Sequence, residues 1–140
     1  MSIEEREKEL VEEFALFDDW MGKYEYIIDL GKDVPMIADK YKDDNHLIKG
    51  CQSKVWLHSE MKDGHIYYTA DSDAMITKGL VAMVISVLTG HTPEEILNAK
   101  LDFINQIGLH DHLSPTRSNG LLSMVKQIKL DAAAHRAIKN

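Results

Sequence analysis

The stretch SKVWLHSEMKDGHIYYTAD, at residues 53–71, decides which fold the sequence predicts. Asp63 and Gly64 stand in its middle, and an Asp-Gly pair between two alternating segments is the strongest short-range signal for a two-residue hairpin turn. If these two residues form the turn, Leu57 must lie opposite Ala70. The stretch therefore predicts two antiparallel strands in a fixed register.

This register divides the hairpin into an apolar and a polar face, because successive side chains of a strand point to opposite sides. The apolar face holds Val55, Leu57, Met61, Ile66, Tyr68 and Ala70, and the polar face holds Lys54, Trp56, His58, Glu60, Tyr67 and Thr69. Two strands alone are only marginally stable in water, so other elements must bury the apolar face. The short run at residues 46–49 offers a third strand, which would turn at Gly50 and Cys51.

Helical patterns precede the hairpin. An apolar face spaced four, three and four residues apart predicts one helix over residues 3–21. The members of this face are Leu10, Phe14, Phe17 and Met21. A second helix is expected over residues 24–30, ended by Gly31. The polar residues 32–46 are typical of a surface connection, with a helical turn at 36–41.

Helical patterns also follow the hairpin. Residues 74–89 are apolar nearly all round, which predicts a buried central helix that Gly90 closes in a left-handed turn. The capping box Thr92-Pro93-Glu94-Glu95 starts a short helix. Ser114-Pro115 starts a further turn, and Ser118 is expected to cap the last helix. The apolar face of that helix consists of Leu121, Val125, Ile128 and Ala132.

The composition is that of a globular protein with one core. The chain has 140 residues, of which 44% are hydrophobic and 28% are charged, and this length is enough to bury a core. We therefore expect a single domain over residues 1–140. Its predicted class is α/β (α+β), with a small antiparallel sheet packed against a layer of helices.

Charge and hydropathy exclude several kinds of partner. A formal net charge of −7 argues against nucleic acid or an anionic membrane. The longest apolar run, residues 80–85, is far too short to span a membrane, and the acidic N-terminus is unlike a secretory signal. One cysteine cannot form an internal disulfide, which suits a reducing compartment. We expect a cytoplasmic protein.

Cys51 is the only cysteine, and it follows Gly50 directly before the first predicted strand. Gly50 gives the backbone freedom to turn, and Gln52 and Ser53 supply hydrogen-bond donors. These features suit a nucleophilic thiol on a loop tip. A lone cysteine must pass any covalent intermediate to another molecule. The alternative is a cysteine buried as a small hydrophobic residue.

The seven histidines raise two other kinds of chemistry. His110-Asp111-His112, taken with Cys51, has the residue types of a mixed zinc site, but the close ligand pair typical of zinc sites is absent from the sequence, so we expect no metal. A cysteine-dependent enzyme, hydrolytic or reactive toward peroxides or thioesters, would pair Cys51 with a histidine base. Candidates for that base are His58, His65, His110 and His112. The sequence has no Walker loop and no Rossmann glycine pattern.

Three blocks of the sequence resemble motifs of the SufE family of sulfur acceptors. The blocks are GCQSKVW at residues 50–56, ADSDA at 70–74 with KGL at 78–80, and LSPTRSNGL at 113–121. They stand in the family's order, and the resemblance extends over about residues 5–135. It covers both SufE itself and its CsdE-type sister.

The resemblance implies a sulfur carrier that is not an enzyme on its own. SufE-like proteins take persulfide sulfur from a pyridoxal-phosphate cysteine desulfurase of the SufS type, stimulate that desulfurase, and pass the sulfur to an iron–sulfur scaffold of the SufBCD type. The resemblance places the acceptor role on Cys51. It marks Gly50, Gln52, Asp73 and Arg117 as supporting positions near the partner surface. It assigns the chain no cofactor of its own and implies an IscU-like fold, with monomer and homodimer both open.

These roles carry expectations about burial and contacts. Because a solvated persulfide is easily reduced or oxidised, we expect Cys51 to be largely buried, with Gly50 as the hinge that lets its loop swing out. Asp73 is expected to cap the helix that starts at the next residue. Arg117 either faces the partner or caps the turn at Ser114.

Overall fold

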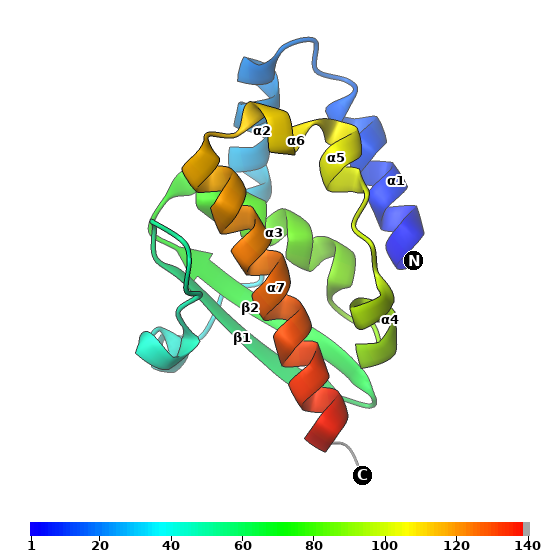
Figure 1. Ribbon diagram of the computed structural model, residues 1–140, viewed down its shortest axis with the longest axis vertical. Helices are drawn as coiled ribbons and strands as arrows, with labels where there is room; N and C mark the ends of the chain where they lie inside the picture. The colour runs from blue at the N-terminus through cyan, green and yellow to red at the C-terminus, as the bar shows by residue number, and fades with distance from the viewer. Residues whose placement is uncertain (139–140) are drawn as a thin grey trace.

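The hairpin predicted from Asp63 and Gly64 is present in the computed structural model, which describes residues 1–138 (Figure 1). Strand β1 (Val55–Lys62) pairs antiparallel with β2 (His65–Ser72), and Leu57 lies opposite Ala70. Asp63 and Gly64 have φ angles of 53° and 81°. Two consecutive positive φ angles make the turn that matches the twist of the strands. The predicted register is therefore confirmed.

Helices account for most of the remaining elements. In chain order they are α1 (Ile3–Phe14), α2 (Trp20–Lys32), the 3-10 turns η1 (Asp39–Tyr41) and η2 (Asp44–His46), α3 (Met75–Leu88), α4 (Pro93–Asn98), α5 (Phe103–Ile107), α6 (Leu109–His112) and α7 (Pro115–Ile138). This is the predicted α+β class, a small antiparallel sheet against helices. Within residues 1–138, none of these helices has both the length and the apolar character needed to cross a membrane.

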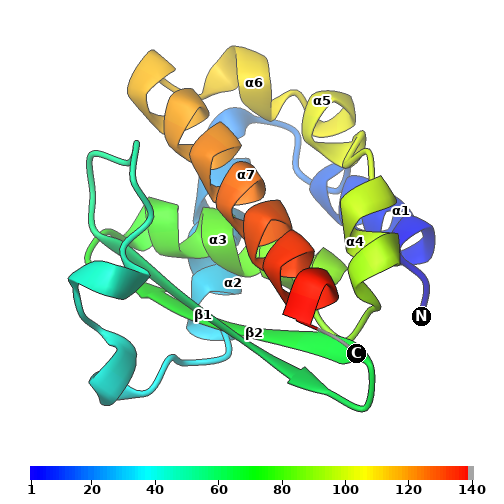
Figure 2. The same ribbon diagram turned by 60° about the horizontal axis from the view of Figure 1, so that its bottom comes forward.

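The apolar face of the hairpin is buried, as its pattern predicts. Val55, Leu57, Ile66, Tyr68 and Ala70 are all buried, and Met61 is half-buried. Figure 2 shows α3 and α7 on the same side of the hairpin, with α7 running diagonally across it. The hydroxyl of Tyr68 donates a hydrogen bond of 2.9 Å to the carbonyl oxygen of Ile128 in α7. The hairpin and the last helix are thus joined by both apolar and polar contacts.

The predicted third strand at residues 46–49 is wrong. Leu47 makes one isolated antiparallel bridge with Trp56, and within residues 1–138 the sheet has two strands. The run is bounded by the 3-10 turn η2 on one side and by the left-handed Gly50 on the other. This leaves too few extended residues for a continuous ladder.

The prediction of one helix over residues 3–21 is also wrong. α1 ends at Phe14, and α2 begins at Trp20 because Asp19 caps it, accepting a hydrogen bond of 2.8 Å from the backbone N–H of Gly22. Met21 therefore lies in α2, where its side chain is exposed. A strong N-cap outweighs the continued apolar spacing. The second predicted helix, at residues 24–30, lies entirely within α2, but Gly31 does not end it, because α2 continues to Lys32.

The central helix α3 is buried along most of its length, as predicted. Its Gly79 lies against α2 so closely that a Cβ atom there would overlap the carbonyl group of Ile27. A Cβ atom on Gly31 of α2 would in turn lie 3.0 Å from the backbone nitrogen of Gly79. The two helices thus make a backbone-to-backbone contact that requires glycine. Gly90 has the expected left-handed φ of 77°, but it does not close α3: the C-cap is Thr89, and the N–H of Gly90 donates to the carbonyl oxygen of Ile66 in β2.

The C-terminal elements agree with the sequence in part. α4 has the predicted capping box of Thr92 and Glu95. α5 and α6 were not predicted, because helices this short show no periodic pattern. α7 begins at Pro115, where the hydroxyl of Ser114 accepts the backbone N–H of Arg117 at 3.3 Å. Ser118, the predicted cap, is instead buried within α7.

A buried carboxylate holds the connection between α2 and β1 against the hairpin. Asp71 of β2 pairs with Lys42 of the connection at 2.7 Å and with Lys78 of α3 at 3.3 Å. Burial alone would raise the pKa of Asp71, but hydrogen bonds from Lys42, from the backbone N–H of Ser72 and from Lys78 lower it overall. The carboxylate therefore stays ionised and ties three segments together.

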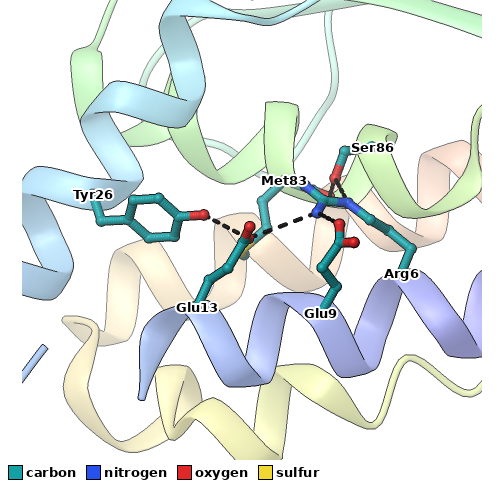
Figure 3. A network of polar contacts seen from close by, with 6 residues as sticks. All are labelled: Arg6, Glu9, Glu13, Tyr26, Met83 and Ser86. Atoms are coloured by element: carbon teal, nitrogen blue, oxygen red, sulfur yellow. Dashed lines mark hydrogen bonds and ion pairs between the residues drawn. The ribbon is translucent and has the colours of Figure 1, made fainter. Parts of the chain in front are cut away.

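A polar network joins α1 to α2 and α3 (Figure 3). The guanidinium of Arg6 pairs with Glu9 and, at 3.6 Å, with Glu13, and its Nε donates to the hydroxyl of Ser86 in α3 at 3.3 Å. The hydroxyl of Tyr26 in α2 donates to Glu13 at 2.6 Å. Burial and this hydrogen bond raise the pKa of Tyr26. The network fixes the first helix on the central one.

Gly79→Ala should strongly destabilise the fold, because the added methyl group would overlap the backbone of α2 at Ile27. Overpacking of this kind costs about 1–3 kcal/mol, and more where backbone must move. We expect a lower urea midpoint by circular dichroism. Gly22→Ala is the matched control, because a methyl group there meets only side-chain atoms of Asp19 and Phe17. Equal midpoints for the two variants would contradict the proposed backbone contact.

Candidate functional site

Cys51 lies on the loop between η2 and β1, at the point where the chain turns toward the first strand. Gly50 has a φ angle of 93°, which favours glycine. A Cβ atom on Gly50 would collide with the hydroxyl of Ser123 in α7. The sequence therefore needs glycine before Cys51 for two reasons, the turn itself and the close approach of α7.

The thiol of Cys51 faces the first turns of α7. Its S–H donates a hydrogen bond of 3.5 Å to the carbonyl oxygen of Gly120. A Cβ atom on Gly120 would lie 3.6 Å from Sγ, in ordinary van der Waals contact. Cys51 is half-buried, rather than largely buried as expected, and it packs against the hydrophobic core. Burial raises the pKa of the Cys51 thiol, so the loop holds it in its protonated form.

Cys51 opens into a cavity of about 480 Å³ between α2, α3 and the start of α7. The lining residues are Ile28, Cys51, Gln52, Ser53, Ala74, Met75, Ile76, Thr77, Leu80, Ser114, Thr116, Arg117, Gly120 and Met124. The lining combines apolar side chains with hydroxyl groups and one cation, Arg117. The site therefore combines a sheltered thiol with an exposed positive charge at its rim.

Asp73 does not cap α3, contrary to the prediction. The cap position is Ala74, whose side chain makes no capping bond. The Asp73 carboxylate instead accepts the backbone N–H of Lys54 at 3.0 Å, and the N–H of Asp73 donates to the carbonyl oxygen of Lys54 at 3.2 Å. The backbone N–H of Ala74 donates to the hydroxyl of Ser72 at 3.2 Å. Asp73 thus anchors the end of the Cys51 loop.

Arg117 and Gln52 line the cavity, and both are exposed. The bond that caps the turn at Ser114 comes from the backbone N–H of Arg117 and does not involve its guanidinium. The structure therefore brings together Cys51, Gly50, Gln52 and Arg117. Asp73 lies outside the cavity lining and anchors the end of the loop through Lys54.

Within residues 1–138, no histidine lines the Cys51 cavity. His110 contacts the hydroxyl of Ser118 at 3.0 Å, and His112 stacks on Trp20. His58 and His65 lie on the hairpin, away from the cavity. In the part of the chain that the structure describes, the structure therefore places none of the four candidate bases at the Cys51 cavity. In the same part of the chain, no group of three or more His, Cys, Asp or Glu residues is placed to hold a metal ion.

Sequence reasoning missed the residues of α7 that face the thiol. Gly120 and Ser123 contact the Cys51 loop, although they lie far away from it in the chain. The one available signal was Gly120 itself, because a glycine inside a helical pattern often marks a close approach. The apolar part of the lining, which includes Ile28 and Leu80, has no local signal, since its members look like ordinary core residues.

The raised pKa of Cys51 predicts a slow and pH-dependent thiol. We expect alkylation by iodoacetamide to be slower in the folded protein than in the same chain unfolded in urea. The inflection of the rate with pH should lie above the value for the unfolded chain, because burial disfavours the thiolate. An inflection at or below the unfolded value would show that the thiol is not sheltered in the resting protein.

Known proteins resemble this chain in sequence and in fold. The model of the SufE family, described as an Fe-S metabolism associated domain, matches residues 8–132. An uncharacterized SufE-like protein of Rhizobium meliloti is 37% identical over 129 residues, which are 89% of this chain and 92% of that protein. Another, from Rhizobium etli, is 38% identical over 136 residues, which are 92% of this chain and 90% of that protein.

A solved structure has a similar arrangement. The solution structure of a hypothetical protein from Thermus thermophilus superposes with a TM-score of 0.76 at 18% identity, over 92% of this chain and 94% of that one. At this identity the likeness concerns the fold alone. The family match and the two relatives establish more: the chain belongs to the SufE family, whose domain is associated with Fe–S metabolism.

Proposed function

We propose that the protein is a sulfur acceptor that takes persulfide sulfur onto Cys51 from a SufS-type cysteine desulfurase. It stimulates that desulfurase and passes the sulfur to an iron–sulfur scaffold of the SufBCD type, with residues 1–140 acting as one domain. The observation that carries the proposal is the position of the only cysteine, half-buried at a cavity lined by apolar side chains, hydroxyl groups and a single cation. A reducing cytoplasm keeps such a thiol ready to react.

The transfer step is a thiol–disulfide type exchange on sulfur. The Cys51 thiolate attacks the outer sulfur of the desulfurase persulfide, and a new S–S bond forms at Cys51 while the S–S bond of the donor breaks. The donor cysteine leaves as a thiolate and accepts the proton that Cys51 has lost. The step therefore needs no external oxidant or reductant.

Reaction requires the loop to leave its resting position, because burial keeps the thiol protonated. Hydrogen bonds hold the loop at both ends. The N–H of Ile48 donates to the carbonyl oxygen of Val55 at 2.8 Å, and the backbone of Lys54 makes two hydrogen bonds with Asp73. Residues 49–53 lie between these anchors. Gly50, with its left-handed φ, is the natural hinge for an outward swing of these residues.

The supporting residues have distinct roles in this scheme. Asp73 keeps the strand end fixed while the loop moves. Arg117 lines the cavity and is exposed, so its permanent charge is available to a carboxylate of the partner. Gln52, exposed beside Cys51, offers an amide donor and acceptor to the docked partner.

Incubation with a SufS-type desulfurase, cysteine and pyridoxal phosphate should add one or more sulfur atoms to Cys51, as measured by intact mass spectrometry. The added mass should disappear on reduction with dithiothreitol. Cys51→Ser should gain nothing under the same conditions. An active desulfurase that leaves the mass of the wild-type protein unchanged would refute the acceptor role.

Arg117→Ala should weaken stimulation of the desulfurase much more than it weakens the fold. The side chain is exposed and does not cap the turn, so the loss of stability should stay below about 0.5 kcal/mol. Loss of a charge-assisted contact at an interface can cost about 2–5 kcal/mol. The measurements are the urea midpoint and the stimulated desulfurase rate on one preparation.

Lys126→Ala, which removes an exposed cation of α7 outside the cavity lining, is the matched control for Arg117. It should leave both the urea midpoint and the stimulated rate unchanged. If Arg117→Ala lowers the midpoint while the folded fraction still stimulates the desulfurase normally, the side chain has a structural role and our assignment is wrong.

A further inference from the structure

A second cavity, of about 550 Å³, lies between η2, β1 and the C-terminal half of α7. None of its lining residues lines the Cys51 cavity. Three histidines reach it, His46 from η2, His58 from β1 and His135 from α7. In Figure 1 the 3-10 turns stand at the side of the hairpin, next to β1. The proposed sulfur chemistry uses none of these residues.

Two of these histidines face each other. Nε2 of His46 lies 3.4 Å from Nδ1 of His58. The outer nitrogen of each ring meets a carboxylate: Nδ1 of His46 lies 2.7 Å from Asp43, and Nε2 of His58 lies 3.2 Å from Glu60. The ring of Tyr41 stacks on His58, with ring centroids 3.7 Å apart. Both imidazole rings are therefore fixed in position by neighbouring side chains.

The carboxylates determine which nitrogens carry protons. An ionised carboxylate can only accept a hydrogen bond, so His46 donates its Nδ1–H to Asp43 and His58 donates its Nε2–H to Glu60. In the neutral rings the two facing nitrogens then present lone pairs to each other. This arrangement is unfavourable unless a positively charged species lies between them.

The separation of the two nitrogens matches that of two nitrogens bound to one metal ion. A hydrogen bond of 3.4 Å between the rings is long beside the about 2.7–3.2 Å usual for N–H···O bonds, and it needs a proton on a facing nitrogen in addition to those on the outer nitrogens. Zinc–nitrogen bonds of about 2.0–2.1 Å in a tetrahedral arrangement place two ligand nitrogens about 3.3–3.4 Å apart. The observed separation equals this distance.

We propose that His46 and His58 form a two-histidine clamp for a divalent transition-metal ion, with Zn²⁺ as the ion that fits the geometry best. Asp43 and Glu60 orient the rings from behind, the arrangement that metal-binding histidines commonly have. Imidazole is a favoured ligand of zinc, copper and nickel. The clamp shares no residue with the lining of the Cys51 cavity, and its test does not depend on the sulfur-transfer proposal.

The site has an open coordination sphere. Because residues 1–138 contain no group of three or more suitable ligands, the clamp supplies two protein ligands only. Both histidines line the cavity, so water or a small ligand held there would have to complete the sphere. A site of this kind binds an exchangeable ion rather than a permanent structural one, and its two ligands come from different elements, η2 and β1.

Isothermal titration with Zn²⁺ tests the clamp. We expect one equivalent to bind the wild-type protein, and the same equivalent to bind Cys51→Ser, which lacks the only thiol. His46→Ala and His58→Phe should each weaken this binding at least about tenfold. The phenylalanine variant keeps a ring that stacks on Tyr41, so that loss of binding is separated from loss of the fold.

His91→Ala is the matched control, because His91 also faces a carboxylate, Glu95 at 3.6 Å, but lies outside the second cavity. It should bind Zn²⁺ as the wild type does. Glu60→Gln should weaken binding about tenfold, the effect expected for a group that orients a ligand. Co²⁺ in place of Zn²⁺ should give the intense visible absorption of a tetrahedral complex.

Two results would overturn the proposal. One is the absence of saturable Zn²⁺ binding to the wild-type protein. The other is binding that vanishes in Cys51→Ser or that survives in both His46→Ala and His58→Phe, since the ion would then lie elsewhere. Circular dichroism of each metal-free variant verifies that the compared proteins are folded.

Discussion

The burial of one face of a two-stranded hairpin is the constraint on which the structure depends. Two strands cannot stay folded in water with an exposed apolar face, and α3 and α7 are the elements that cover it. The hydroxyl of Tyr68 fixes the position of α7 through the carbonyl oxygen of Ile128. Once α7 is placed, its first turns bring Gly120 and Arg117 to the loop that precedes β1. The packing that stabilises the sheet therefore also builds the Cys51 cavity.

The elements that were predicted correctly have strong signals within a few residues. The Asp63-Gly64 turn determines the hairpin register, because a two-residue loop allows one pairing only. The apolar central helix and the capping box at Thr92 are equally local. The errors arose where two local signals compete. At Asp19 a helix cap interrupts an apolar spacing that continues through Met21, and at Ser118 the true cap is the hydroxyl four residues earlier.

The residues of the candidate site also differ in whether a local signal in the sequence reveals them. Cys51 and Gly50 could be found from the sequence, because a lone thiol after a glycine is a feature of neighbouring residues. The cavity walls could not, because they come from α2, α3 and α7 and consist of residue types that also fill an ordinary core. Asp73 was predicted to cap the helix that follows it, a role that it does not have. Its carboxylate bonds to Lys54 across the hairpin end, a contact that depends on the strand register and not on the helix that follows.

Strand β1 links the two cavities. Its first residue, Val55, anchors the start of the Cys51 loop through Ile48, while His58 lines the second cavity. The turn that carries His46 ends four residues before Gly50, so the segment between the two sites is short. A ligand that joins His46 to His58 fixes η2 on the strand and removes freedom from the segment that leads into the loop. Such a ligand reinforces the anchor at Ile48, from which residues 49–53 must swing, without contacting the lining of the Cys51 cavity.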